Sequence, residues 1–480
     1  MGSLSFALKP AFTKISYKQA HNLDAIIYFK APAVDAVKRT PLHLIASVDV
    51  SGSMGGEKIE MVKRSLAKLV EHLTEEDYFG IVAFTTDVQT ICRPAFMTTE
   101  NKNTFQQAIA KLTAQSMTNF SGGLVQALRL LNDDPLDKQC IRRVIMFTDG
   151  HPTCGVRDIE GITRLGKEHL GMGSVTCFGY GSDHDPELLN TLSAQANGNF
   201  YYGETPDKIM ESFAAELGGL ITSAAQLLKF RLLPSQGVKI NEIYNDMTVS
   251  EDDGKIVAEI GDVLAESEVA VAFSLKVDAR NKAFPRATTI LRCEVEYLDL
   301  ATSKTITEDL QLRVEFVKPE DVDTKIDPEV DKHVMLQKSV QVELRARHLA
   351  DQGDYKGANI AMLNFVAESA LAGHQELSED IARSAVNYSS SACYLGGGRH
   401  SNVARVRAKS LGRGTGQLVY GSSYTSAQSD MASSWTSTPD PAPANPSLSD
   451  DAVEAILDSV SELRDDGKEA SSYIKSRKGW

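Results

Sequence analysis

Residues 42–54 read LHLIASVDVSGSM, and this stretch decides the fold of the segment around it. The run from Leu42 to Val48 is almost continuously apolar, as is typical of a strand whose sheet is covered on both faces. Asp49 ends the run. Apolar residues then recur at spacings of three and four from Ile59 to Leu73, which predicts an amphipathic helix. A strand, a short polar turn and a helix together indicate the start of an α/β unit.

The same alternation continues over residues 41–222. Further strands are expected at 78–85, 143–148, 175–179 and 200–202, and further helices at 105–112, 123–131, 186–195 and 207–220. We therefore expect strands and helices to alternate throughout, in a doubly wound, mostly parallel α/β sheet with helices on both faces. Such sheets bind ligands at the carboxyl ends of their strands, where the winding reverses.

Oxygen-bearing side chains gather at the expected carboxyl ends of these strands. Asp49, Ser51 and Ser53 follow the first strand, Asp149 ends a central strand, and Thr118 lies in a loop before a helix. Hydroxyls, carboxylates and water suit a small hard cation, so we expect Mg²⁺ here, with Mn²⁺ or Ca²⁺ as alternatives. The rim that a partner would contact is predicted to comprise Met54, Gly150 and His151.

The pattern resembles the metal-ion-dependent adhesion site of von Willebrand factor A domains over roughly residues 42–222. It has the three parts of that motif: Asp-x-Ser-x-Ser, a distant threonine, and Thr-Asp-Gly after an apolar strand. The resemblance implies that Ser51, Ser53 and Thr118 contact the metal directly, and that Asp49 and Asp149 do so directly or through water. It also implies cation-dependent recognition of a protein partner whose Asp or Glu completes the coordination.

Catalytic interpretations of the same residues fit the sequence less well. A haloacid-dehalogenase phosphotransferase needs a second aspartate where Ser51 stands, and a hydrolase elbow needs glycine there. A phosphate loop needs Gly-Lys-Ser/Thr, but Gly56 is followed by Glu57. The interpretation of His151 as a general base is less well supported than its interpretation as a rim residue. We therefore expect a binding protein and not an enzyme.

The flanking segments predict further domains. Strand-like stretches in residues 1–40 and short β-rich segments over 223–320 indicate an antiparallel β-sandwich built from both sides of the central domain. Residues 326–388 are typical of a helical hairpin with a third helix. This arrangement resembles inter-alpha-trypsin-inhibitor heavy chains and bacterial and plant von Willebrand factor A proteins. Ser, Gly and Pro predict a flexible linker at 389–449, before an amphipathic helix at 450–466.

Composition narrows the class of protein. A net charge of −14 over 480 residues argues against general nucleic-acid binding. No apolar run reaches the roughly 20 residues of a membrane-spanning helix, and the start lacks a secretory signal pattern. Six dispersed cysteines without a CxxC pair favour free thiols, so we expect a cytoplasmic protein.

Several alternatives stay open at this stage. The basic segment 396–413 is either a docking arm for an acidic partner or for nucleic acid, or a solvated linker. The helix at 450–466 either packs on its own chain or binds a groove on a partner or on another copy of the chain. The whole chain is an adhesion or scaffold module, a substrate-recruiting subunit of an AAA⁺ ATPase or ubiquitin-ligase assembly, or a self-assembling structural protein.

Overall fold

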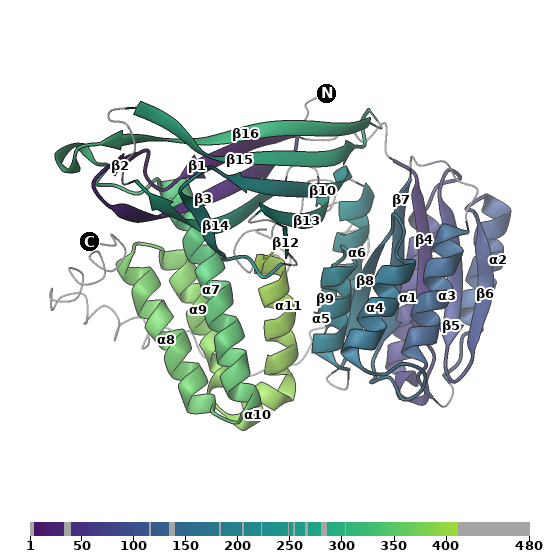
Figure 1. Ribbon diagram of the computed structural model, residues 1–480. Coiled ribbons are helices and arrows are strands. Elements are labelled where there is room, and N and C mark those ends of the chain that lie inside the picture. The colour runs from purple at the N-terminus through teal and green to yellow at the C-terminus, as the bar shows by residue number, and fades with distance from the viewer. Residues whose placement is uncertain are drawn as a thin grey trace.

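A computed structural model describes residues 4–410, apart from short segments at 33–39, 115–116, 134–139, 182–183, 204–205, 222, 248, 253–254, 265–266, 280–285 and 303. Three parts lie side by side in it: a β-sandwich, a helical bundle below it, and an α/β domain beside both (Figure 1). The predicted helix at 450–466 and the linker beyond residue 410 lie outside the described residues.

The α/β domain is built on a six-stranded sheet in the order β6-β5-β4-β7-β8-β9. Its strands are β4 (Leu42–Asp49), β5 (Tyr78–Phe84), β6 (Val88–Phe96), β7 (Ile141–Thr148), β8 (Ser174–Tyr180) and β9 (Phe200–Gly203). Every residue of β4, β7 and β8 is buried, because helices cover both faces. The predicted α/β fold with a mostly parallel sheet is therefore confirmed.

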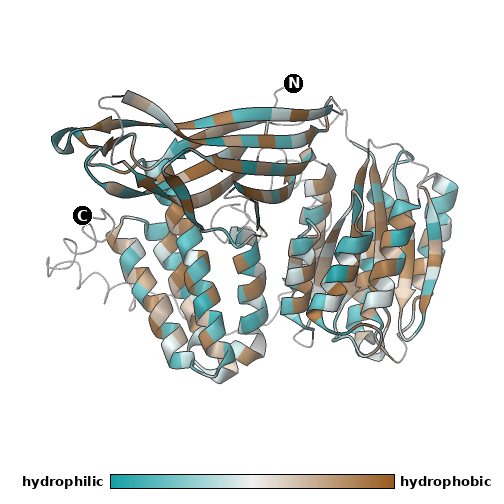
Figure 2. Cartoon of the chain, viewed as in Figure 1, coloured by the Kyte–Doolittle hydropathy of each residue, from teal (hydrophilic) through white to brown (hydrophobic). Residues whose placement is uncertain are grey.

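Helices cover the sheet in two layers. One hydrophobic cluster joins the sheet to α1 (Glu57–His72), α2 (Thr99–Ala110) and α6 (Pro206–Ile221). A second cluster joins the opposite face to α3 (Phe120–Asn132), α4 (Ile159–His169) and α5 (Pro186–Gln195). Figure 2 shows the same design as hydrophobic strands flanked by helices with mixed surfaces.

One detail of the predicted sheet is wrong. Strands and helices do not alternate throughout, because β6 follows β5 directly and pairs with it antiparallel. The half-buried pattern of β6 and its Pro94 are those of an edge strand. Helix α4 was also not predicted, since Gly161 and Gly166 weaken its helical pattern.

The β-sandwich consists of two sheets assembled from both sides of the α/β domain. One has the order β1-β3-β14-β11 and the other β12-β13-β10-β15-β16-β2. The strands are β1 (Ser5–Pro10), β2 (Lys14–Ser16), β3 (Ala20–Lys30), β10 (Ser223–Pro234), β11 (Val238–Ile243), β12 (Val249–Asp252), β13 (Lys255–Leu264), β14 (Glu268–Asp278), β15 (Arg286–Asp299) and β16 (Lys304–Val317). Strand β3 lies between β1 and β14, so N-terminal residues complete the sandwich as its central strand.

The helical bundle extends further along the chain than the sequence predicted. It contains α7 (Pro328–Asp351), α8 (Tyr355–Leu371), α9 (Gln375–Ala385), α10 (Ser391–Cys393), a π-helical turn (Tyr394–Gly398) and α11 (Arg399–Ser410). The prediction that a flexible linker begins at 389 is wrong for residues 391–410. Helix α11 lies between α7 and the α/β domain, where it packs against α5 and β9 (Figure 1).

The basic residues of α11 explain why this helix is ordered. Arg405 forms an ion pair with Glu343 of α7, and Lys409 contacts both Glu343, at 3.0 Å, and Asp380 of α9. The Lys409 and Glu343 side chains are fully buried. Within the described residues, the basic segment is thus an internal clamp and neither a docking arm nor a solvated linker. Its acidic partners lie elsewhere in the chain, so its local sequence does not reveal the pairing.

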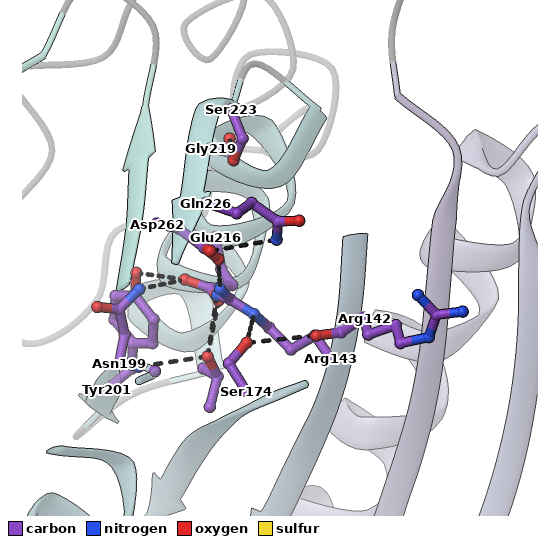
Figure 3. Close-up of polar contacts among 12 residues, drawn as sticks. Arg142, Arg143, Ser174, Asn199, Tyr201, Glu216, Gly219, Ser223, Gln226 and Asp262 are labelled. Atoms are coloured by element: carbon purple, nitrogen blue, oxygen red, sulfur yellow. Dashed lines mark hydrogen bonds and ion pairs between the residues drawn. The ribbon is translucent and has the colours of Figure 1, made fainter. Parts of the chain in front are cut away.

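A buried polar network joins the α/β domain to the sandwich at the edge where the parallel strands begin (Figure 3). Arg143 of β7 forms ion pairs with Glu216 of α6 and with Asp262 of β13. Glu216 also accepts hydrogen bonds from Thr176 at 2.7 Å and Tyr201 at 2.8 Å. Burial by itself would raise the pKa of Glu216, but Arg143 and these donors hold it below its usual value. The network therefore fixes α6 and the sandwich to the sheet.

Candidate metal centre

The predicted site lies at the carboxyl ends of β4 and β7, opposite to the end of the sheet that holds the Arg143 network. Asp49, the last residue of β4, is completely buried. The backbone N–H of Ser51 donates to Asp49 Oδ1 at 2.8 Å, and the Thr148 hydroxyl donates to Oδ2 at 2.6 Å. Burial raises the pKa of Asp49 to about 6, although these hydrogen bonds act against the rise. A buried carboxylate of this kind is stabilised by a nearby cation.

Asp149 lies beside Asp49 and is held from two sides. The Ser53 hydroxyl donates to Asp149 Oδ1 at 2.8 Å, and the Lys58 ammonium forms an ion pair with Oδ2. Ser51 Oγ and Ser53 Oγ are 3.1 Å apart and share a hydrogen bond. A short 3₁₀ turn, Gly52–Met54, carries Ser53 to this position before α1 begins. The two serines and the two aspartates therefore form one connected group.

Thr118 reaches the same place from the loop before α3. Its backbone is fixed by Thr153, which accepts from Thr118 N–H through its hydroxyl at 2.8 Å and donates its own N–H to the Thr118 carbonyl at 3.0 Å. A Cβ atom on Gly150 would lie 3.5 Å from Ser53 Oγ and 3.8 Å from Thr118 Oγ1. These two hydroxyls thus flank Gly150. The structure brings together all five predicted site residues.

The predicted rim needs one correction. Met54 is completely buried and belongs to the hydrophobic cluster beneath the turn, so it does not face a partner. Its apolar side chain is better stabilised there than at a polar edge. His151 is exposed and Gly150 is partly exposed, as a rim requires.

The donors fit a hard divalent cation. They comprise two carboxylates and three hydroxyls, all oxygen ligands of the kind that Mg²⁺ prefers. In the part of the chain that is described, no group of three or more His, Cys, Asp or Glu side chains is arranged to hold a metal ion. A cationic group already contacts Asp149 in the form of the Lys58 ammonium.

Sequence reasoning assigned no individual role to three residues that support the site. Thr148 donates to Asp49, Lys58 pairs with Asp149, and Thr153 fixes the Thr118 loop. Thr148 directly precedes Asp149, and Lys58 follows Ser53 by five positions. Their proximity in the sequence was a usable signal, but their contacts depend on the fold.

Comparison with known proteins identifies the kind of domain that contains the site. Residues 43–215 match the family model of the von Willebrand factor type A domain. The chain contains such a domain, and domains of this class are generally interaction modules. A solved von Willebrand factor type A protein from Catenulispora acidiphila aligns with 79% of this chain and 89% of its own, with a TM-score of 0.66 and 16% identity. The ArnB paralog VWA2 from Sulfolobus acidocaldarius covers 86% of this chain, with a TM-score of 0.57 and 16% identity.

Two kinds of sequence relative are similar to this chain over different lengths. Human inter-alpha-trypsin inhibitor heavy chain H4 is 28% identical over 179 residues, which is 36% of this chain and 19% of that protein. The chain thus matches about a fifth of the length of these heavy chains. The uncharacterized protein sll0103 of Synechocystis is 24% identical over 356 residues, covering 71% of this chain and 81% of that protein. The latter similarity extends well beyond the von Willebrand factor A domain.

Proposed function

We propose that this chain is a divalent-cation-dependent protein-binding module that captures an acidic side chain of a partner. The proposal rests on five oxygen-bearing side chains that come together at the carboxyl ends of β4 and β7. They are Asp49, Ser51, Ser53, Thr118 and Asp149. A bound Mg²⁺, or Mn²⁺ or Ca²⁺, would supply an electrophilic centre for a carboxylate. The hydroxyls of this chain would hold the ion without neutralising it.

The residues around the centre favour recognition over catalysis. Asp49 is buried beneath the turn and Asp149 is also fully buried, so neither is placed as an accessible acid or base. The Ser53 hydroxyl donates a hydrogen bond to Asp149, and no histidine contact to Ser53 is found among the described residues. A serine nucleophile is commonly activated by such a histidine. We therefore propose that the protein acts by binding and that His151 shapes the binding surface.

The proposal is tested first with metal alone. Calorimetric titration of the full chain with Mg²⁺ and Mn²⁺ should show one site, and Asp149→Ala should abolish it. Asp87→Ala is a matched control, because it removes an exposed carboxylate from the turn between β5 and β6. Undiminished affinity in Asp149→Ala would refute the site.

Partner capture is the second test. Immobilised chain should retain a protein partner in Mg²⁺ and release it in EDTA, and retention should fail with Asp149→Ala. Retention that is equal with and without chelator would show that recognition runs through another surface.

We also propose a reducing, cytoplasmic location for the chain. None of the six cysteines is in a disulfide bond, and four of them are buried. Fractionation with thiol labelling in cells would test this, and labelled thiols recovered in a secreted fraction would contradict it.

A further inference from the structure

Lys58 occupies an unusual position next to the candidate metal centre. It is the second residue of α1, where a positive charge is disfavoured by the helix dipole. Its ammonium pairs with Asp149 Oδ2, while Ser53 donates to Oδ1. A Cβ atom on Gly181 would lie 3.4 Å from Lys58 Cε and 3.6 Å from Nζ, so the side chain runs between the ends of β7 and β8.

This placement alters the charge of the site. Asp49 and Asp149 contribute two negative charges when ionised, and Lys58 contributes one positive charge. A divalent cation bound there would leave a net charge of +1 with Lys58 present, and none without it. The Lys58 side chain is only 26% exposed and Asp149 is fully buried, so solvent screens this pair less than a surface pair.

We propose that Lys58 sets the balance between metal affinity and ligand affinity at this site. Its ammonium repels the divalent cation and weakens metal binding. The same charge attracts an incoming carboxylate and strengthens ligand binding at the loaded site. Lys58 thus tunes both affinities through its charge and is not itself a metal ligand. This inference rests on the proposed function, since it assumes that metal and carboxylate bind in sequence.

The inference predicts opposite effects from one substitution. Lys58→Met keeps most of the aliphatic stem and removes the charge. We expect it to tighten Mn²⁺ binding about tenfold and to weaken carboxylate binding at the Mn²⁺-loaded site about tenfold, since one partly screened charge is worth on the order of a factor of ten. Lys58→Arg should restore both affinities towards the original values, because the positive charge is retained.

Two measurements on the full chain test this. Mn²⁺ binding is measured by electron paramagnetic resonance of the free ion. Acetate binding to the Mn²⁺-loaded protein is measured by the loss of water-proton relaxation as a coordinated water is displaced. Lys68→Met is the matched control, because Lys68 lies on the same helix and pairs with Glu71 at the surface. It should change neither affinity.

Each outcome decides the matter. If Lys58→Met weakens both affinities, Lys58 only holds Asp149 in place and the inference is wrong. If metal binding tightens while acetate binding is unchanged, Lys58 merely competes with the metal, and the inference is again wrong. If the unsubstituted chain binds no Mn²⁺, or binds acetate equally well without metal, the proposed function itself is refuted. That result is distinguishable because it does not involve Lys58.

Discussion

Removing Arg143 should have a large effect on stability, although this residue lies at the other end of β7 from the candidate metal centre. Arg143→Met would leave the carboxylates of Glu216 and Asp262 without their shared cation, and all three side chains are at most 10% exposed. Breaking a buried ion pair from one side costs about 3–5 kcal/mol. Glu216 keeps its hydrogen bonds from Thr176 and Tyr201, which favours the lower part of that range.

Urea denaturation followed by far-ultraviolet circular dichroism measures the loss, and hydrogen exchange locates it. Protection should fall first in α6 and β13, the elements that Arg143 joins. Arg164→Met is the control, because Arg164 is 73% exposed and pairs with Glu168 only at 4.0 Å. Such a surface pair contributes about 0–1 kcal/mol. A loss for Arg143→Met no larger than that of the control would refute the reasoning.

The pH dependence gives an independent check on the same network. With Arg143 present, the pKa of Glu216 lies below its usual value. Its stabilising contribution is therefore present at neutral pH and is lost as the pH falls through the lowered folded-state pKa. In Arg143→Met, burial should raise this pKa above the unfolded value, so protonation would relieve the defect. The deficit of the variant should shrink as the pH is lowered from 7 towards 5, and a deficit that grows would contradict this account.

Three further outcomes follow from the bundle and its contact with the α/β domain. Lys409→Met should destabilise α11 by about 3–5 kcal/mol, since it leaves the buried Glu343 carboxylate with less positive charge beside it. Slower hydrogen exchange of the α11 amides would contradict this. Arg383→Gln is the control, because Arg383 is exposed. Burial lowers the pKa of His184 to about 3, so the free energy of unfolding should fall as the pH drops from about 6.5 towards 3. The fall should be at most about 1.4 kcal/mol per pH unit, and His184→Phe should flatten this slope in acid titrations. A chain ending at residue 388 should melt at a lower temperature than one ending at 410, because only the latter keeps α11; equal melting temperatures would show that the clamp contributes nothing.

The sequence determined the outline of the fold because its strongest signals are local. Apolar runs such as Leu42–Val48 predict buried parallel strands without knowledge of their neighbours. The aspartates and serines of the site lie close to such runs, whereas Thr118 lies in a loop. What was missed depends on distant partners. The basic residues of α11 have the composition of a solvated segment until Glu343 and Asp380 are placed beside them. The contact of Lys58 with Asp149 is likewise visible only once β7 lies next to β4.

The insertion of the α/β domain into the sandwich has a consequence for biosynthesis. Strand β3 pairs with β14, and Lys30 meets Glu268 across 238 positions of sequence. At roughly 5–20 residues per second, the ribosome needs about 12–48 s to produce that partner strand. During this time the β3 edge of the β1–β3 hairpin is unpaired and its apolar face is uncovered, which favours association with other nascent chains. Early folding of the α/β domain would shorten the effective loop that must close. Substitutions that slow the folding of this domain should therefore reduce the yield of native protein during translation more than they reduce the stability of the finished molecule.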